Sequence, residues 1–379
     1  MRGSQVHLVT ADRVIAAERD LSPGVVEIER GRIVRVREGR VPRADLTVAG
    51  GILAPGLVDL QINGAARVDF LTSDAAEFDR ARRYLLSTGT TAFLPTLITA
   101  PLSLVEAALD RWRAQRDGAP RVLGVHVEGP FLNPAYAGAH AVRYLRPPRL
   151  TELRRLLVRH PGLVKILTLA PELRGASALI RDARKRGVVV AAGHTAATYG
   201  EARAAFDGGV RLVTHLFNAM RPLRHRDPGI VAASLQDPRI TVSLIADLVH
   251  VDPAILQLVF ATKPWDRIAL ITDALAAAGT PGRTSRLATR RLRVTDAPRL
   301  PGGTLAGSVL GMDQAVRNAV HLGVPLRAAV GMASTVPATL LRRRDLGVIA
   351  PGARADFVLF DRRLRVRMVL VDGAVVHKG

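Results

Sequence analysis

Several short apolar runs in the chain end in groups that can bind a metal ion or move a proton. Glu128, His194 and His215 can serve as three ligands of a divalent metal such as Zn²⁺ and leave one position for water. Such a metal lowers the pKa of its bound water to about 7. Asp273 can act as general base on that water and then as general acid on a leaving amine, and His250 can polarise a carbonyl group. These residues together indicate metal-assisted hydrolysis.

Each of these residues also has a structural explanation when it is taken alone. A single His at a strand end is more often a hydrogen-bonded core residue than a ligand, and Asp273 could cap the following segment. Asn218 could satisfy a turn. The explanation weakens for the whole set, because burying so many ionisable groups in one core costs more than gathering them around a metal or a substrate.

The segments between these residues alternate between two patterns. Strand-like apolar runs are found at 51–61, 89–98, 121–129, 163–171, 187–195, 210–218, 240–250 and 267–275. Amphipathic, helix-like segments separate most of them, at 74–87, 102–115, 151–160, 176–187, 198–209 and 252–263. Apolar strands that alternate with helices predict a parallel sheet, and eight such units predict a (β/α)₈ TIM barrel with its active site at the carboxyl ends of the strands.

A doubly wound open sheet is the competing architecture. It is disfavoured because residues 63–70, NGAARVDF, do not form the G-x-G-x-x-G phosphate loop expected after the first strand.

Both ends of the chain differ from the middle. They consist of short strand-like runs with turn signals, such as Asp372-Gly373. We therefore expect a small β-sandwich domain built from residues 1–53 and 349–379, with residues 54–348 forming the barrel.

Composition limits the possible chemistry and partners. The 379 residues are 48% hydrophobic and include no Cys, so any metal site must use His and carboxylate ligands. The net charge is +21, but the basic residues are scattered and no aromatic side chains are interleaved with them, so nucleic-acid binding is not expected as the main function. The positive field could help to attract a phosphorylated substrate. No apolar signal core or membrane-length run is present, so we expect a soluble, cytoplasmic protein with no membrane partner.

The motifs around these residues resemble those of one family. The N-acetylglucosamine-6-phosphate deacetylases, which belong to the amidohydrolase superfamily, have similar motifs in the same order over nearly the whole chain. The matching segments are HVEGPFLNPAYAGAH (126–140), AAGHT (191–195), THLFNAM (214–220), HRDPG (225–229), ADLVHVD (246–252), ITDALAAAG (271–279), TLAGSVLGMDQAVRN (304–318) and GVIAPGARADFVLFD (347–361).

The resemblance implies a homodimer of barrels that hydrolyses N-acetylglucosamine 6-phosphate to glucosamine 6-phosphate and acetate. It implies that Glu128, His194 and His215 bind the metal, that Asp273 is the catalytic acid/base and that His250 lies near the scissile carbonyl. The positions that it assigns to substrate binding are Ala139, His140, Asn218, Ala219, Arg226, Asp247, His250, Leu305, Ala306 and Gly307. His225, beside Arg226, could reach across the dimer interface.

The first predicted strand decides how many metal ions we expect. In GLVDLQING (56–64), Asp59, Gln61 and Asn63 share one face because they are spaced by two. Many amidohydrolases have His-x-His where Gln61 and Asn63 stand, and those histidines bind a second metal. Neutral amides bind Zn²⁺ weakly. We therefore expect one divalent metal per subunit, Zn²⁺ before Fe²⁺, Mn²⁺ or Co²⁺, with Gln61 and Asn63 as polar lining. Asp59 is expected either to support the residues that line the site or to have a structural role.

The sequence departs from the family pattern at two places, and the exact substrate stays open. Ala65-Ala66-Arg67 replaces a glycine-rich stretch, and Val336 stands where Asn is common. An alternative substrate on the same fold is N-acetylgalactosamine 6-phosphate or another N-acyl compound. A basic scaffold without enzymatic activity is a third hypothesis, which the complete catalytic set disfavours.

Overall fold

The barrel consists of eight parallel strands in chain order. The computed structural model of the chain describes residues 5–115, 118–280, 282, 284–288 and 290–379. The strands are β6 (Leu57–Ile62), β9 (Thr90–Ile98), β11 (Val125–Glu128), β12 (Val164–Leu169), β13 (Val189–Ala192), β14 (Leu212–Val213), β15 (Thr241–Ile245) and β16 (Ile268–Ile271). Each pairs in parallel with the next, and a bridge between Ile62 and Ala274 brings the end of β16 back to β6. A short strand, β10 (Arg121–Val122), also pairs with β9. The predicted (β/α)₈ fold is confirmed.

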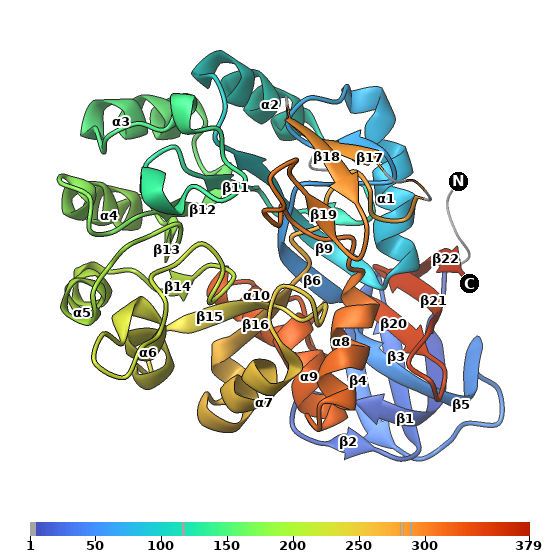
Figure 1. Cartoon of the computed structure of the whole chain (residues 1–379). Coiled ribbons are helices and arrows are strands. Elements are labelled where there is room, and N and C mark those ends of the chain that lie inside the picture. The colour runs from blue at the N-terminus through green and yellow to red at the C-terminus, as the bar shows by residue number, and fades with distance from the viewer. Residues whose placement is uncertain (1–4, 116–117, 281, 283, 289) are drawn as a thin grey trace.

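Helices surround the strands in Figure 1. The six helices predicted from the sequence are present as α1 (Phe78–Ser87), α2 (Leu102–Ala114), α3 (Leu150–Arg159), α4 (Ala176–Lys185), α5 (Tyr199–Gly208) and α7 (Pro253–Thr262). Helices that we did not predict are α6 (Gly229–Gln236), α8 (Met312–His321), α9 (Leu326–Ala333) and α10 (Thr335–Leu340). Four single 3₁₀ turns add η1 (Ala75–Glu77), η2 (Pro134–Tyr136), η3 (Val142–Tyr144) and η4 (Trp265–Arg267).

Local sequence explains where the predicted helices start. Thr198 caps α5, because its hydroxyl accepts the backbone N–H of Glu201 while the Glu201 carboxylate accepts the N–H of Thr198. Asp252 caps α7 by accepting the N–H of Ala254, and Pro253 occupies the first helical position, where no N–H is needed.

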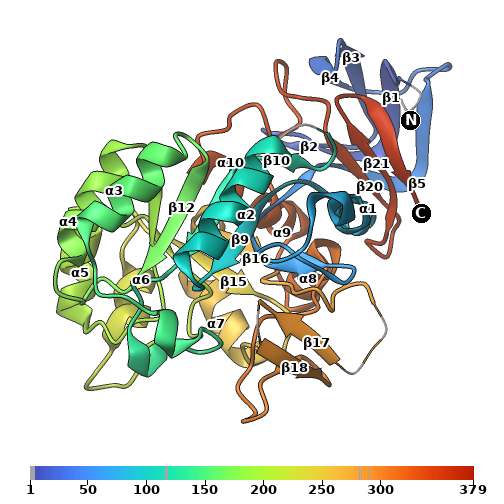
Figure 2. The same ribbon diagram turned by 90° about the horizontal axis from the view of Figure 1, so that it is seen from above.

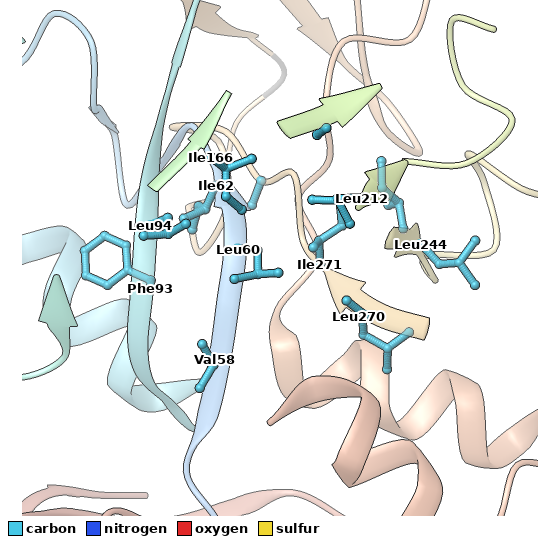
Figure 3. Packing of buried hydrophobic residues seen from close by; sticks show 14 of the residues in the cluster. Val58, Leu60, Ile62, Phe93, Leu94, Ile166, Leu212, Leu244, Leu270 and Ile271 are labelled. Atoms are coloured by element: carbon cyan, nitrogen blue, oxygen red, sulfur yellow. The ribbon is translucent and has the colours of Figure 1, made fainter. Parts of the chain in front are cut away.

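The strands are apolar because they are buried on both faces. All nine residues of β9 are buried, as are all residues of β6 and β15. Figure 3 shows side chains from several strands packed together inside this core, among them Leu60, Leu94 and Leu270. The carboxyl ends of the strands are therefore set on a rigid frame.

The two ends of the chain form a separate β domain, as predicted. Its strands are β1 (Leu8–Ile15), β2 (Asp20–Leu21), β3 (Gly24–Glu29), β4 (Arg32–Glu38), β5 (Leu46–Pro55), β20 (Phe357–Phe360), β21 (Val366–Val371) and β22 (Ala374–Lys378). They belong to one sheet in the order β22-β21-β20-β5-β1-β3-β4, with β2 beside β1, and this sheet has its own core. Figure 1 shows the early strands beside the late ones. The exact boundaries at 53/54 and 348/349 stay a prediction.

Two small hairpins were not predicted. One joins β7 (Gly64–Ala65) to β8 (Val68–Asp69), and the other, formed by β17 (Thr284–Leu287) and β18 (Arg290–Val294), continues into β19 (Pro298–Arg299). The carboxylate of Asp69 accepts the backbone N–H of Ala288 at 2.7 Å and so ties the hairpins together. In Figure 2 the β17–β18 hairpin and the terminal β domain lie on different sides of the barrel.

Within the part of the chain that the structure describes, no helix is long and apolar enough to cross a membrane.

Candidate active site

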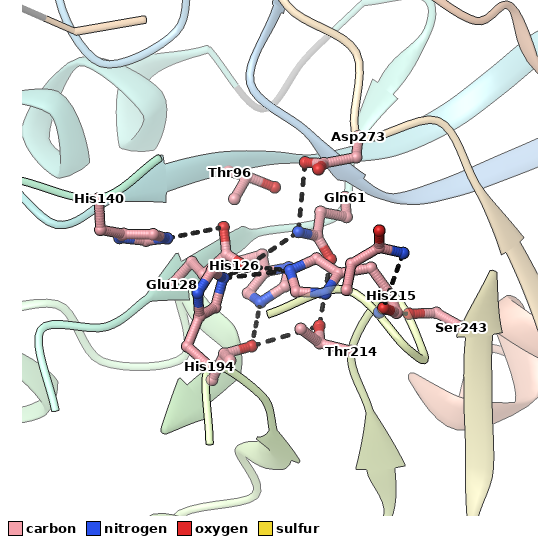
Figure 4. A network of polar contacts seen from close by, with 12 residues as sticks. Gln61, Thr96, His126, Glu128, His140, His194, Thr214, His215, Ser243 and Asp273 are labelled. Atoms are coloured by element: carbon pink, nitrogen blue, oxygen red, sulfur yellow. Dashed lines mark hydrogen bonds and ion pairs between the residues drawn. The ribbon is translucent and has the colours of Figure 1, made fainter. Parts of the chain in front are cut away.

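Three buried side chains converge at the carboxyl end of the barrel. Glu128 is the last residue of β11, and His194 and His215 lie in the turns that follow β13 and β14. Nε2 of His215 lies 3.1 Å from Oε1 of Glu128 and 3.1 Å from Nε2 of His194, and the distance from Nε2 of His194 to Oε1 of Glu128 is 3.3 Å. Figure 4 shows the three groups facing one another. The structure therefore brings together the three residues predicted as metal ligands.

The hydrogen bond from His194 to a backbone carbonyl shows which of its two ring nitrogens carries the proton. Nδ1 of His194 lies 2.9 Å from the carbonyl oxygen of Tyr136, and a carbonyl can only accept, so Nδ1 carries the proton. The lone pair of Nε2 then points at Glu128 and His215. Ligand atoms about 2.0–2.1 Å from a tetrahedral Zn²⁺ lie about 3.3–3.4 Å apart, which is close to the spacing found here. The donor set and its spacing therefore fit a divalent metal ion.

Glu128 is held in its charged form. Burial by itself would raise its pKa, but the interactions with the imidazoles of His140, His194 and His215 outweigh burial and hold the pKa well below the ordinary value. The backbone N–H of Thr99 donates to Nδ1 of His140, so Nε2 of His140 carries the proton, and it faces Oε2 of Glu128 at 3.6 Å. Oε2 is thereby engaged, and Oε1 faces the two other imidazoles.

Asp273 lies beside the cluster, and its carboxylate is held by amides from β6 and the turn that follows. Asn63 donates to Oδ1 of Asp273 at 2.7 Å, and Gln61 donates to the same oxygen at 3.3 Å. Burial raises the pKa of Asp273, and the charge of Glu128 raises it further. A carboxylate with a raised pKa is suited to take up a proton and release it again.

Asp59, the third polar residue of the first barrel strand, faces β16. Oδ2 of Asp59 accepts the hydroxyl of Thr272 at 2.5 Å, and Oδ1 accepts the backbone N–H groups of Gln61 and Thr272. Burial raises the pKa of Asp59 to about 7 despite these donors. Asp59 thus anchors the residue that precedes Asp273.

His250 has a partner that fixes its orientation. Oδ2 of Asp247 lies 2.7 Å from Nδ1 of His250, so Nδ1 is the donor and Nε2 is turned away from this carboxylate. Burial would raise the pKa of Asp247, but its hydrogen bonds with His250 and the charge of His250 lower it. Asp247 therefore fixes the orientation of the His250 ring.

A cavity of about 280 Å³ opens at this end of the barrel. Among its lining residues are these predicted site residues: Asn63, Glu128, Ala139, His140, His194, His215, Asn218, Ala219, His250, Asp273, Leu305 and Gly307. Three predicted residues are not part of the lining: Gln61 and Ala306, which are buried, and Asp247, which bonds His250. Arg226 and His225 are exposed in the loop before α6, outside the lining.

Some residues of the site were not predicted. Tyr136 lines the cavity and bonds His194 through its backbone carbonyl, while Thr99 bonds His140 through its backbone N–H and its hydroxyl. The hydroxyl of Thr214 bonds Gln61, and none of the three residues has a distinctive sequence signal. Leu287 reaches the cavity from the β17–β18 hairpin. His126 bonds the carbonyl oxygen of Leu60 and the hydroxyl of Thr168 rather than joining the cluster, and burial lowers its pKa to about 4.

A buried Glu/His/His cluster beside a catalytic-type carboxylate, at the carboxyl end of a (β/α)₈ barrel, defines the class of metal-assisted hydrolases. Residues 52–376 match the amidohydrolase family. The chain belongs to that family, and the predicted membership is confirmed.

The chain is similar to proteins of known name over almost its full length. It is 37% identical to N-acetylgalactosamine-6-phosphate deacetylase of Escherichia coli O157:H7, covering 97% of this chain and 98% of the relative. It is also 37% identical to N-acetylglucosamine-6-phosphate deacetylase of Bos taurus, covering 89% and 87%. The solved structure of a mutant of N-acetyl-D-glucosamine-6-phosphate deacetylase from Mycobacterium smegmatis, in complex with N-acetyl-D-glucosamine-6-phosphate, superposes with a TM-score of 0.94 at 37% identity, covering 98% and 100%.

Proposed function

We propose that the chain hydrolyses N-acetylglucosamine 6-phosphate to glucosamine 6-phosphate and acetate, as a step of amino-sugar catabolism. The observation that carries the proposal is the Glu128, His194 and His215 cluster with Asp273 beside it, in a cavity of a barrel that is similar to deacetylases over nearly its whole length. A phosphorylated amino sugar as substrate favours a cytoplasmic enzyme, because charged sugars do not cross membranes unaided.

Glu128, His194 and His215 would hold one divalent metal per subunit, and we propose Zn²⁺. When bound, such an ion lowers the pKa of a water molecule and polarises a carbonyl oxygen. Gln61 and Asn63 have amides where a second metal would need imidazoles, which supports a single ion.

Asp273 moves the proton. Its carboxylate takes a proton from the attacking water, whose oxygen forms a bond to the acetamide carbon. The same proton then goes to the sugar nitrogen as the C–N bond breaks, which releases the amine and acetic acid, and the acid then loses its proton to give acetate. His250, held through Nδ1 by Asp247, donates from a protonated Nε2 to the carbonyl oxygen and so stabilises the negative charge that develops there.

The remaining predicted residues bind the substrate. We propose that Ala139, His140 and the segment 305–307 contact the sugar, and that Asn218 and Ala219 contact the phosphate side. Arg226 is exposed in a loop and forms part of the phosphate site in our proposal, from its own subunit or, with His225, from the second subunit of a homodimer.

The galacto epimer is a second candidate, because a relative that is 37% identical over 97% of this chain is named for N-acetylgalactosamine 6-phosphate. The two sugars differ only at the 4-hydroxyl group.

Acetate release from both epimers by the purified, metal-loaded chain tests the proposal. We expect a larger kcat/KM for the gluco epimer. A larger value for the galacto epimer would reverse the order of the two candidates, and no acetate from either would refute deacetylation of these sugars.

A further inference from the structure

The Gln61 side chain lies between two buried carboxylates. Its Nε2 donates to Oε1 of Glu128 at 3.0 Å and to Oδ1 of Asp273 at 3.3 Å, and the residue is only 1% exposed. Figure 4 shows the amide between the two acids. Because an ionised carboxylate can only accept, the NH₂ end of the amide must face both of them.

The shape of an amide does not by itself decide which end faces the acids, because its oxygen and nitrogen ends are nearly the same size. The two carboxylates favour one direction, and a contact at the other end of the side chain holds the amide in that direction. The hydroxyl of Thr214 donates to Oε1 of Gln61 at 3.1 Å, and Thr214 is fully buried. If the amide turned over, its oxygen would face two carboxylates, and the Thr214 hydroxyl would have to accept from the NH₂ group instead of donating to Oε1.

We propose that Thr214 is a positioning residue for the reaction: its hydroxyl fixes the direction of the Gln61 amide, so that the NH₂ group bridges the Glu128 and Asp273 carboxylates. The amide thereby brings positive hydrogen atoms to both acids without adding a charge. The inference rests on the proposed function, since it gives Thr214 and Gln61 a task in that same site.

The chain order makes this arrangement compact. Thr214 immediately precedes His215, so the turn after β14 supplies both a metal ligand and the hydroxyl that orients the amide. Gln61 lies in β6, the first strand, and Glu128 in β11. A change at Thr214 that moves the Gln61 amide therefore affects both the metal ligand Glu128 and the proton carrier Asp273.

Thr214→Val tests the inference, because valine keeps the shape of threonine and removes the hydroxyl. The measurements are the affinity for Zn²⁺, from competition with a chelator in the absence of substrate, and kcat and KM for acetate release. We expect both Zn²⁺ affinity and kcat to fall roughly 10–100-fold, with KM changed less than twofold. Thr214→Ser, which keeps the hydroxyl, should stay close to the wild type in both measurements.

A double-mutant cycle separates action through Gln61 from any other effect of Thr214. In a Gln61→Leu background, Thr214→Val should change Zn²⁺ affinity and kcat by less than twofold. If Thr214→Val costs the same factor in both backgrounds, or if Thr214→Ser is as impaired as Thr214→Val, the inference is wrong. Wild-type Zn²⁺ affinity and kcat in a folded Thr214→Val would also overturn it.

Two features of the experiment allow its outcome to be interpreted. Thr214→Ala replaces Thr214→Val if circular dichroism shows that the valine variant does not fold. The Zn²⁺ measurement uses no substrate, so it decides whether Thr214 positions the site even if the wild type releases no acetate, which would count against the proposed function alone.

Discussion

The carboxylate of Asp273 is held on one oxygen by its neighbours. Both amide groups, from Gln61 and Asn63, donate to Oδ1, so Oδ2 is the oxygen that we propose takes up the proton. The backbone of Asp273 supports this placement, because it adopts a left-handed conformation with φ of 48° and its N–H donates to the carbonyl oxygen of Gln61 at 2.8 Å. The side chain is thus oriented before any substrate arrives.

Replacing Asp273 with Asn removes the proton carrier and changes the size of the side chain little. We expect kcat to fall roughly 10²–10⁴-fold, while the metal content of the purified variant stays at the wild-type value. Acetate release and elemental analysis check the two parts. Full activity in Asp273→Asn would mean that another group moves the proton.

Removal of the metal is a second test at the scale of single residues. Without an ion, Oε1 of Glu128 and Nε2 of His194, which both carry lone pairs, lie 3.3 Å apart, and both residues are buried. We expect a chelator to abolish activity and to lower the melting temperature, and added Zn²⁺ to restore both. Elemental analysis should find one tightly bound metal per chain, and two would contradict the role assigned to Gln61 and Asn63.

The sequence predicted these residues because their types are distinctive and their spacing follows the strands. Glu128, His194 and His215 could be selected without coordinates, since each lies within or near the end of an apolar run of the predicted barrel. Thr214 and Thr99 could not, because a threonine hydroxyl is common and its partner is set only by the fold. Arg226 was predicted by its motif, but the lining of the cavity in one chain does not include it.

At the scale of elements, strands were easier to predict than some helices. Seven of the eight barrel strands lie inside the predicted runs, and β6 extends one residue, Ile62, beyond the run at 51–61. Helix α6 was missed because its sequence, GIVAASLQ, is apolar on most sides and therefore lacks the alternation of faces that marks a surface helix. The β17–β18 hairpin was missed because its Arg-rich strands have few apolar residues and pair mainly with each other.

Asp237, at the end of α6, gives a prediction for this element. Its carboxylate accepts the backbone N–H and the Nε of Arg239, each at 2.9 Å, and Nη2 at 2.6 Å. Hydrogen bonds from Arg239 lower the pKa of Asp237 to about 2 from 3.8. The folded state therefore binds the proton less tightly than the unfolded state, so this stabilisation is complete above about pH 4 and is lost as the pH falls towards 2.

We expect Asp237→Asn to lower the free energy of unfolding by about 1–3 kcal/mol at pH 7, and the difference from the wild type to shrink between pH 4 and pH 2. Urea unfolding at several pH values measures it. Asp207→Asn is the matched control, because Asp207 also bonds Arg239, at 2.8 Å, but is exposed and should contribute little. An equal loss at pH 7 and pH 2 would contradict the argument.

At the scale of the whole molecule, the positively charged side chains lie outside the lining of the candidate active site. The chain has a net charge of +21, yet none of the described residues that line the cavity is Lys or Arg. Attraction of a phosphorylated substrate must then come partly from the long-range field, which salt screens over about 10 Å at 0.1 M and about 3 Å at 1 M.

We therefore expect kcat/KM for the sugar phosphate to fall as NaCl is raised from 0.02 to 0.5 M, with most of the change in KM. Initial rates of acetate release at each salt concentration measure the effect. An uncharged N-acetyl sugar, if it is hydrolysed, should show a much weaker dependence. A flat profile for the phosphorylated substrate would mean that the field does not contribute.

The terminal β domain has a consequence for how the protein is made. β5 ends at Pro55 and pairs on one side with β1 and on the other with β20, which begins at Phe357, so that second edge of β5 lacks its partner until the ribosome has added the whole barrel. At roughly 5–20 residues per second this takes roughly 15–60 s. During that time the edge of β5 is open to pairing with other nascent chains. A chain whose synthesis stops before β20 should therefore aggregate instead of giving a soluble barrel. The yield of soluble protein thus depends on the last strands of the chain.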